Sequence, residues 1–252
     1  MKSLFVIFVV AAAVLGAPSE DVDGRIAGGY DVDIANYPYM LQLEYMDELV
    51  CGAILVTPNY ALTSAQCLRS RYAEYFLVRA GSATLYEGGQ ELLIQNIVYH
   101  PQFEVSNNNY DVALMLLSGS VSNANPISLA TNDDAIVEGA SLTVAGWGWE
   151  EFVYYTEFST NLKVVEIPIL GNEACSSAYD IVSDVMFCAA YLEATGRGFC
   201  FGDNGGPGVI NGVLVGVISF GQGCGDGTHA GVLIRVSKVR DWIYNIIGTV
   251  DV

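Results

Sequence analysis

Basic residues are scarce in this chain. Lys and Arg together number 10 of 252 residues, against 28 Asp and Glu, and the formal net charge at pH 7 is −18. Proteins that bind nucleic acid or anionic membranes neutralise phosphate groups with Lys and Arg, so we exclude both classes of partner. The hydrophobic fraction of 52% supports a large core and excludes an intrinsically disordered chain.

Apolar runs long enough to cross a bilayer, about 20 residues, are also missing. The apolar run from Leu4 to Leu15 follows Lys2 and precedes the small residues Gly16 and Ala17. This order is typical of a secretory signal peptide. We therefore expect residues 1–16 to be removed and the mature protein to be secreted and extracellular.

Histidine is nearly absent, and no Cys-x-x-Cys pair occurs, so we expect neither a metal site nor a cofactor. The chain contains an even number of cysteines, which in a secreted protein is typical of disulfides. Many pairings are possible, and the sequence alone does not choose among them. The six are Cys51, Cys67, Cys175, Cys188, Cys200 and Cys224.

Short apolar segments separated by Gly, Asn and Asp predict an all-β sandwich or barrel. The final segment differs, because its apolar residues between Val236 and Thr249 recur at helical spacing, and it predicts a C-terminal amphipathic helix. No repeat or linker divides the chain, so we expect one compact unit. The predicted strands are Met40–Glu44, Gly52–Val56, Tyr75–Arg79, Leu92–Val98, Val112–Leu117, Ser141–Ala145, Lys163–Ile167, Val213–Phe220 and Gly231–Val236.

Four motifs in order resemble the chymotrypsin/trypsin family of serine proteases. Residues 25–29 (RIAGG) resemble its zymogen cleavage site, and residues 63–67 (TSAQC), after the CGA at 51–53, resemble its first disulfide loop. Residues 110–114 (YDVAL) resemble the segment of its catalytic Asp, and residues 202–207 (GDNGGP) resemble its nucleophile loop. The resemblance implies two packed six-stranded antiparallel β-barrels with a C-terminal α-helix.

The same resemblance assigns roles to further residues. It implies a short propeptide over residues 17–25, a peptidase-like domain over residues 26–252, and cleavage between Arg25 and Ile26, whose new amine would pair with Asp203. It implies an oxyanion hole from the backbone amides of Gly202 and Asn204. It also implies the disulfides Cys51–Cys67, Cys175–Cys188 and Cys200–Cys224.

Two positions depart from the family pattern. Gln66 stands where the family has its general-base His, and Asn204 stands where it has its nucleophilic Ser, while Asp111 is retained. An amide nitrogen is a poor nucleophile, and the Gln amide does not titrate near neutral pH. The sequence therefore predicts that the chain is not an enzyme. Asp111 is expected to be a buried acid that accepts hydrogen bonds from Gln66 and nearby backbone.

The specificity pocket departs as well. Gly198 replaces the Asp that would select Lys or Arg, and the adjacent Phe199 is large enough to fill much of the pocket. We expect a blocked, apolar remnant that also includes Ser219, Gly221 and Gly231.

The main hypothesis is a secreted, monomeric protein that binds extracellular proteins. Its pattern is similar to the inactivated serine protease paralogues of parasitic mites and to the mite group 3 allergens, which implies that it inhibits host complement. Trp149, Tyr154 and Tyr155 are candidate anchors for such a contact. Two alternatives stay open: a cofactor or regulator of an extracellular protease cascade, and a hydrolase that uses Ser64 or Ser219. His100 is expected in a surface turn and His229 in an exposed loop.

Overall fold

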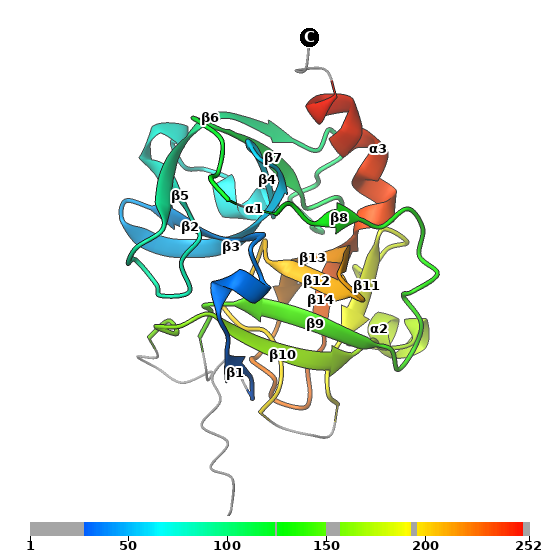
Figure 1. Cartoon of the computed structure of the whole chain (residues 1–252). Helices are drawn as coiled ribbons and strands as arrows, with labels where there is room; N and C mark the ends of the chain where they lie inside the picture. Colours follow the sequence, from blue (N-terminus) through cyan, green and yellow to red (C-terminus); the bar gives the residue numbers. More distant parts are fainter. Residues whose placement is uncertain (1–27, 124, 150–156, 193–195, 249–252) are drawn as a thin grey trace, which may run out of the picture.

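The first half of the molecule is a closed six-stranded barrel. The structure, a computed structural model, describes residues 28–123, 125–149, 157–192 and 196–248. The barrel order is β2-β3-β4-β7-β6-β5, and β5 pairs with β2 to close it (Figure 1). Its strands are β2 (Met40–Tyr45), β3 (Glu48–Thr57), β4 (Tyr60–Thr63), β5 (Phe76–Ala80), β6 (Gln90–Tyr99) and β7 (Ala113–Leu117).

The second half is a sheet in which six strands follow the order β10-β9-β12-β13-β14-β11. Backbone hydrogen bonds from Leu170 to Cys188 and from Ala190 to Pro168 bring the ends of the two outer strands, β10 and β11, together. Two short strands, β1 (Tyr30–Asp31) and β8 (Ser128–Leu129), extend the expected set of six. The six are β9 (Ser141–Gly146), β10 (Lys163–Pro168), β11 (Met186–Ala189), β12 (Pro207–Ile210), β13 (Val213–Gly221) and β14 (Gly231–Arg235).

Strand β3 shows why several segments read as continuous apolar runs rather than alternating ones. Ala53 and Leu55 pack inside the first barrel, whereas Ile54 and Val56 face the second half. Both faces of the strand are therefore buried, which removes the polar positions that a half-exposed strand would carry. The shared core between the halves fixes the junction where the candidate site lies.

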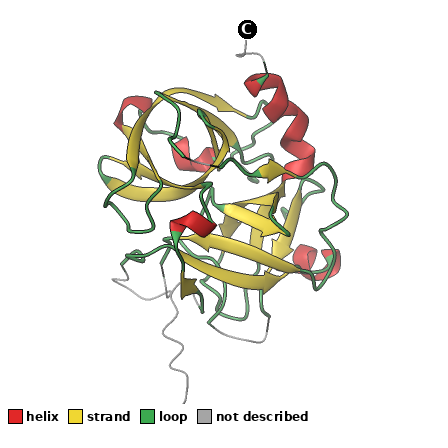
Figure 2. Ribbon diagram, in the orientation of Figure 1, coloured by secondary structure: helices red, strands yellow, loops and turns green. Residues whose placement is uncertain are grey.

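The helices are few and short, as Figure 2 shows. In the part of the chain that the structure describes, they are α1 (Ala65–Leu68), α2 (Asn172–Ala178), α3 (Val236–Ile247) and two single 3-10 turns (Ile34–Asn36 and Ala73–Tyr75). The C-terminal helix buries Val239 and Ile243 in the core that the halves share, so its prediction is confirmed. The sequence missed β4, β11 and β12, which are four residues long and lack a clear alternation.

Three disulfides join the pairs that the resemblance implied: Cys51–Cys67, Cys175–Cys188 and Cys200–Cys224. Among the described residues, no helix is both long and apolar enough to cross a membrane. The predicted signal peptide and propeptide lie outside the described residues.

Candidate active site

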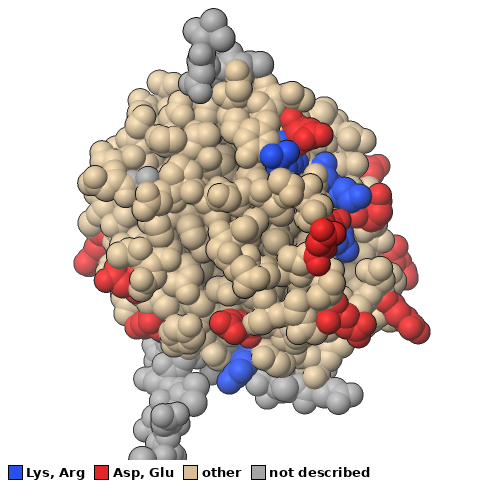
Figure 3. Space-filling model, turned by 45° about the vertical axis from the view of Figure 1, so that its right-hand side comes forward, with Lys and Arg blue, Asp and Glu red and all other residues tan. Residues whose placement is uncertain are grey.

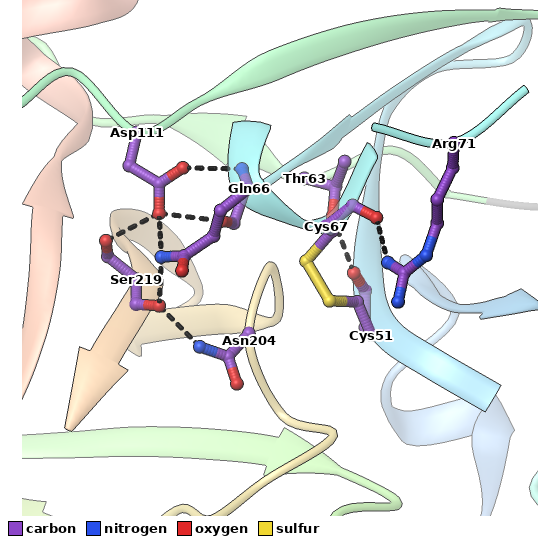
Figure 4. The surroundings of a disulfide bond; sticks show 10 residues. Cys51, Thr63, Gln66, Cys67, Arg71, Asp111, Asn204 and Ser219 are labelled. Carbon is purple, nitrogen blue, oxygen red and sulfur yellow. Dashed lines mark hydrogen bonds between the residues drawn. A yellow bond between two sulfur atoms is a disulfide. The ribbon is translucent and has the colours of Figure 1, made fainter. Parts of the chain in front are cut away.

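Asp111 lies at the junction of the two barrels and is fully buried. Its Oδ1 accepts a hydrogen bond from the backbone N–H of Gln66 at 2.9 Å. Its Oδ2 accepts from Ser64 Oγ at 2.7 Å. The same oxygen accepts from Gln66 Nε2 at 2.7 Å and from Ser219 Oγ at 2.6 Å (Figure 4). The carboxylate therefore has four donors, which offset the cost of burying its charge.

The short helix α1 carries Gln66 and places it against this acid. Ser64 precedes the helix with extended backbone, but its hydroxyl donates to Asp111 instead of capping the helix. The Cys51–Cys67 disulfide ties the helix to β3 one residue after Gln66. The helix is only four residues long, so this covalent link and the Asp111 contacts hold it in place.

Asn204 comes from the opposite half and meets Gln66 through a shared acceptor. Both side-chain amides donate to the backbone oxygen of Ser219, Gln66 at 3.0 Å and Asn204 at a shorter distance (Figure 4). Asn204 also reaches the first barrel through its own backbone oxygen, which accepts from the N–H of Gly52 at 2.8 Å. The structure thus brings Gln66, Asp111 and Asn204 together, as the resemblance implied.

Gly205 explains how the loop after Asn204 approaches the first barrel so closely. Its φ is +79°, and a Cβ there would lie 2.1 Å from Thr63 Oγ1 and 2.5 Å from the backbone oxygen of Gly52. Only glycine avoids both the backbone strain and the overlap.

The alternative nucleophiles Ser64 and Ser219 are fully buried. Each donates its hydroxyl to Asp111, so neither faces a space that a substrate carbonyl could enter. The hydrolase hypothesis based on them is not supported. This position also corrects the prediction that Ser219 lines the pocket, because its side chain points away from it.

A cavity of about 230 Å³ opens beside Asn204 and Gln66. Phe199 is 8% exposed, and its ring crosses the space between Gly221 and Gly231. A Cβ at Gly231 would lie only 1.9 Å from Cζ of that ring. Gly198 is part of the cavity wall, which is also formed by Phe201, Phe220 and Gln222. The aromatic ring therefore occupies the part of the space that lies between these two glycines.

Asp203, next to Asn204, is a second fully buried acid. It accepts from the backbone N–H of Gly148 at 2.8 Å and from that of Cys200 at 2.9 Å. Burial raises the pKa of Asp203 to about 7, although the two backbone hydrogen bonds oppose the shift. Its predicted partner, Ile26, and the cleavage residue Arg25 lie outside the described residues.

The remaining sequence predictions have mixed outcomes. His100 is buried, not in a surface turn, because its ring stacks on Tyr110 at 4.5 Å and meets the edge of Trp242. Burial lowers the pKa of His100, so its ring is neutral at pH 7. His229 lies in an exposed loop, hydrogen-bonded to Asp226. The described part of the chain contains no cluster of three His, Cys, Asp or Glu that could hold a metal.

Two features of the site were not predicted from the sequence. Ser64 and Ser219 supply half of the donors to Asp111, although 108 residues separate Asp111 from Ser219. Phe201 forms part of the cavity wall and contacts Trp149, with ring centroids 5.3 Å apart. No local spacing of residues in the sequence predicts either contact, because both contacts depend on the way the chain packs. The expected anchors Tyr154 and Tyr155 lie outside the described residues.

The molecule has two β-rich halves. At their junction lie the buried acid Asp111, the helical turn that carries Gln66, and the Gly-Asp-Asn-Gly-Gly loop. This arrangement defines the class of chymotrypsin-like serine proteases and their homologues. The family model described as Trypsin matches residues 26–243. A beetle protein named Trypsin, from Phaedon cochleariae, is 32% identical over 94% of this chain and 96% of its own length. Trypsin beta of the fly Drosophila erecta is 34% identical over 97% and 99% of the two chains, and Trypsin 5G1 of the mosquito Aedes aegypti is 33% identical over 89% and 86%. The chain belongs to the trypsin family.

These comparisons correct the prediction that the chain is not an enzyme. Relatives that match it over nearly the whole chain are named trypsins, which are enzymes. The presence of two amides at the junction, Gln66 and Asn204, is therefore not sufficient to conclude that the chain is not an enzyme. The similarity to mite paralogues stays a prediction.

Proposed function

We propose that this chain binds an extended segment of an extracellular protein in the cleft between its two halves. The observation that carries the proposal is the cavity at the junction, which Gln66 and Asn204 border and into which the ring of Phe199 projects beside Gly231. Such a cavity accepts one side chain of a bound segment and limits its size. The secreted location rests on the predicted signal peptide and on the three disulfides.

The end of β13 offers the segment a backbone surface. Phe220 and Gly221 pair with β14 on one side and border the cavity on the other, together with Gln222. An extended peptide can add to such a strand through main-chain hydrogen bonds, while the cavity selects one side chain. Because the ring of Phe199 projects into the cavity, we expect selection for Ala, Ser or Val rather than Lys or Arg.

The charge of the chain bears on the kind of partner. Acidic side chains lie along much of the edge of the face in Figure 3, and the few basic ones gather mostly in one part of it. With a net charge of −18, the chain attracts basic protein surfaces and associates with them faster at low salt. Complement components and proteases of an extracellular cascade are the partners that the sequence resemblance implied.

Binding is tested with a library of extended peptides that varies one central position. The mature chain should retain peptides with small central side chains. The Phe199→Ala variant should accept Leu or Phe there and bind these peptides about tenfold more tightly than the unmodified chain does. Mass spectrometry of the same samples records any cleavage. Equal preferences in both proteins would overturn the proposal, and Phe103→Ala, away from the cavity, is the control for a general loss of packing.

The complement prediction needs its own assay. The folded, disulfide-bonded chain is added to plasma, and complement-mediated lysis of sensitised red cells is measured. A reduction that weakens with added salt supports a complement partner, because salt screens attraction between exposed charges. Unchanged lysis in every complement pathway would contradict the prediction that the partner is a complement component. The proposal that the cleft binds an extended segment would still be tested by the peptide experiment.

A further inference from the structure

A patch of tyrosine rings lies on the first barrel, outside the cavity of the cleft. Tyr45 ends β2, and Tyr72 and Tyr75 lie in the exposed segment between α1 and β5. The ring centroids of Tyr45 and Tyr75 lie 6.1 Å apart, and so do those of Tyr72 and Tyr75. Both pairs meet edge to face, at 89° and 87°, so neighbouring rings present their faces in different directions. None of the three lines the cavity beside Asn204.

Contacts with the barrel hold this patch in place. The backbone N–H of Met46, in the turn between β2 and β3, donates to the backbone oxygen of Tyr75 at 3.0 Å. The buried ring of Phe76 packs against Tyr45, with centroids 4.9 Å apart. Tyr72 is nevertheless 71% exposed and Tyr75 is 47% exposed. Exposed tyrosines that are already positioned are typical of binding surfaces, because they lose little conformational entropy when a ligand binds.

Arg71 adds a positive charge at the edge of the patch. Its guanidinium carbon lies 5.5 Å from the ring centroid of Tyr45, and its Nη1 donates to the backbone oxygen of Cys67. In Figure 4 its side chain and Asp111 lie on opposite sides of the Cys51–Cys67 disulfide. Among the described residues, no carboxylate forms an ion pair with this guanidinium. Its other N–H groups are therefore free to bind an anionic ligand.

The polar groups of the patch favour a ligand that carries hydroxyl groups and a single negative charge. Within the described part of the chain, the hydroxyls of Tyr45, Tyr72 and Tyr75 form no hydrogen bond. The hydroxyls of Tyr86 and Tyr179, by contrast, are held by backbone groups. A phenol ring can stack on the C–H face of a sugar while its hydroxyl bonds to those of the sugar. The net charge of −18 opposes a polyanion, but a single carboxylate can still pair with a guanidinium.

We propose that this patch, made up of Tyr45, Arg71, Tyr72 and Tyr75, binds an acidic sugar at the end of a glycan on an extracellular protein. The carboxylate of the sugar pairs with Arg71, and its ring packs against the exposed faces of Tyr72 and Tyr75. A neutral sugar would not use the guanidinium, and an acidic peptide would not supply the ring of hydroxyls that the phenols can bind. The site does not depend on the proposed cleft binding, so either proposal can fail alone.

The patch is tested with the methyl α-glycoside of N-acetylneuraminic acid. Its neutral match is the carboxamide, which keeps the shape of the sugar and removes its charge. ¹⁹F NMR of 3-fluorotyrosine-labelled protein records binding, and Tyr72→Phe identifies one signal of the patch. We expect the acid to shift that signal and to bind about tenfold more tightly than the amide. Methyl β-D-glucuronide and its amide form a second pair. The same preference in either pair supports the proposal, and the acid that binds more tightly identifies the sugar.

Variants of the patch locate the contact. Arg71→Gln should weaken the acid about tenfold and leave the amide unchanged, whereas Tyr72→Ala should weaken both about fivefold. The matched control is Arg240→Gln on α3, because Arg240 also lies over an exposed tyrosine ring, that of Tyr244 at 4.6 Å, and it should leave binding unchanged.

Three results would overturn the proposal. The first is equal affinity for acid and amide in both pairs of sugars, and the second is an equal loss in Arg71→Gln and Arg240→Gln. The third is binding of acetyl-Asp-amide as tight as that of the acidic sugars, because the patch would then recognise the carboxylate of an acidic peptide. Peptides that bind the cleft should not compete with the sugar, so this experiment and the cleft experiment have separate outcomes.

Discussion

Asp111 and Asp203 are both fully buried near the junction of the two halves, but they are solvated by the protein in different ways. Asp111 accepts hydrogen bonds from two hydroxyls, a side-chain amide and a backbone N–H. Asp203 accepts from two backbone N–H groups, and its pKa rises to about 7. The comparison teaches that two equally buried acids can differ in how far the protein replaces their lost hydration, because one accepts from four donors and the other from two.

The largest expected effect is the pH dependence that Asp203 imposes on the uncleaved chain. Its pKa is about 7 when folded and near 3.8 when unfolded, so the folded state binds more protons between these values. Stability therefore falls as pH rises from about 4 to 7, by about 4 kcal/mol, and levels off above. Urea unfolding across this range measures the slope, and Asp203→Asn should flatten it. An unchanged slope in that variant would contradict the assignment.

The predicted cleavage after Arg25 should change the pH dependence of stability that Asp203 imposes. If the amine of Ile26 pairs with Asp203, as the resemblance implies, the charged carboxylate gains a partner and its pKa falls. The cleaved chain should then lose the decline between about pH 4 and 7. Trypsin cleavage followed by urea unfolding at both pH values tests this, with Asp203→Asn as the control that cleavage should not affect.

Removal of Asp111 is the next largest effect. Asp111→Ala leaves the donors of Ser64, Gln66 and Ser219 without their acceptor in a buried space, and we expect a loss of about 3 kcal/mol at pH 8. Asp203→Ala removes a poorly solvated charge at that pH, so its loss should be about 1 kcal/mol or less. Denaturant midpoints of the two variants provide the check. Equal losses would show that the donor sets do not distinguish the two acids.

The sequence predicted much of this architecture, because the motifs around Asp111 and Asp203 are local. Strands with one buried face and the helix at Val236–Ile247 followed from their periodicity. Short strands such as β12 and the short β8 were missed, since a few buried residues carry no period. His100 was misplaced because its burial depends on Tyr110 and on Trp242 from the far end of the chain. The hydroxyl of Ser219 on Asp111 depends on contacts between the halves, which no local pattern encodes.

Exchange of both amides tests what the Asp111 arrangement can support. Gln66→His places an imidazole where the Gln amide contacts Asp111, and Asn204→Ser supplies a hydroxyl nearby. Asp111 should raise the pKa of the new His, which can then accept and return a proton. We expect the double variant to hydrolyse small-side-chain esters about a hundredfold faster than the unmodified chain. The matched control adds Asp111→Asn, which should remove most of the gain, and a rate equal to that of the unmodified chain would contradict the prediction.

The smallest expected effect is the loss of stability when one of the four hydrogen-bond donors to Asp111 is removed. Ser64→Ala removes one of three hydrogen bonds to Oδ2, while Gln66 and Ser219 continue to donate to the same oxygen. A hydrogen bond to a carboxylate contributes about 1.5 kcal/mol or somewhat more, so the free energy of unfolding should fall by about that amount. Ser177→Ala is the matched control, because its exposed hydroxyl donates to the backbone of α2 and its loss should change stability by less than about 0.5 kcal/mol. A loss in Ser64→Ala as large as that in Asp111→Ala would mean that this one hydroxyl, rather than the set of four donors, keeps the acid in place.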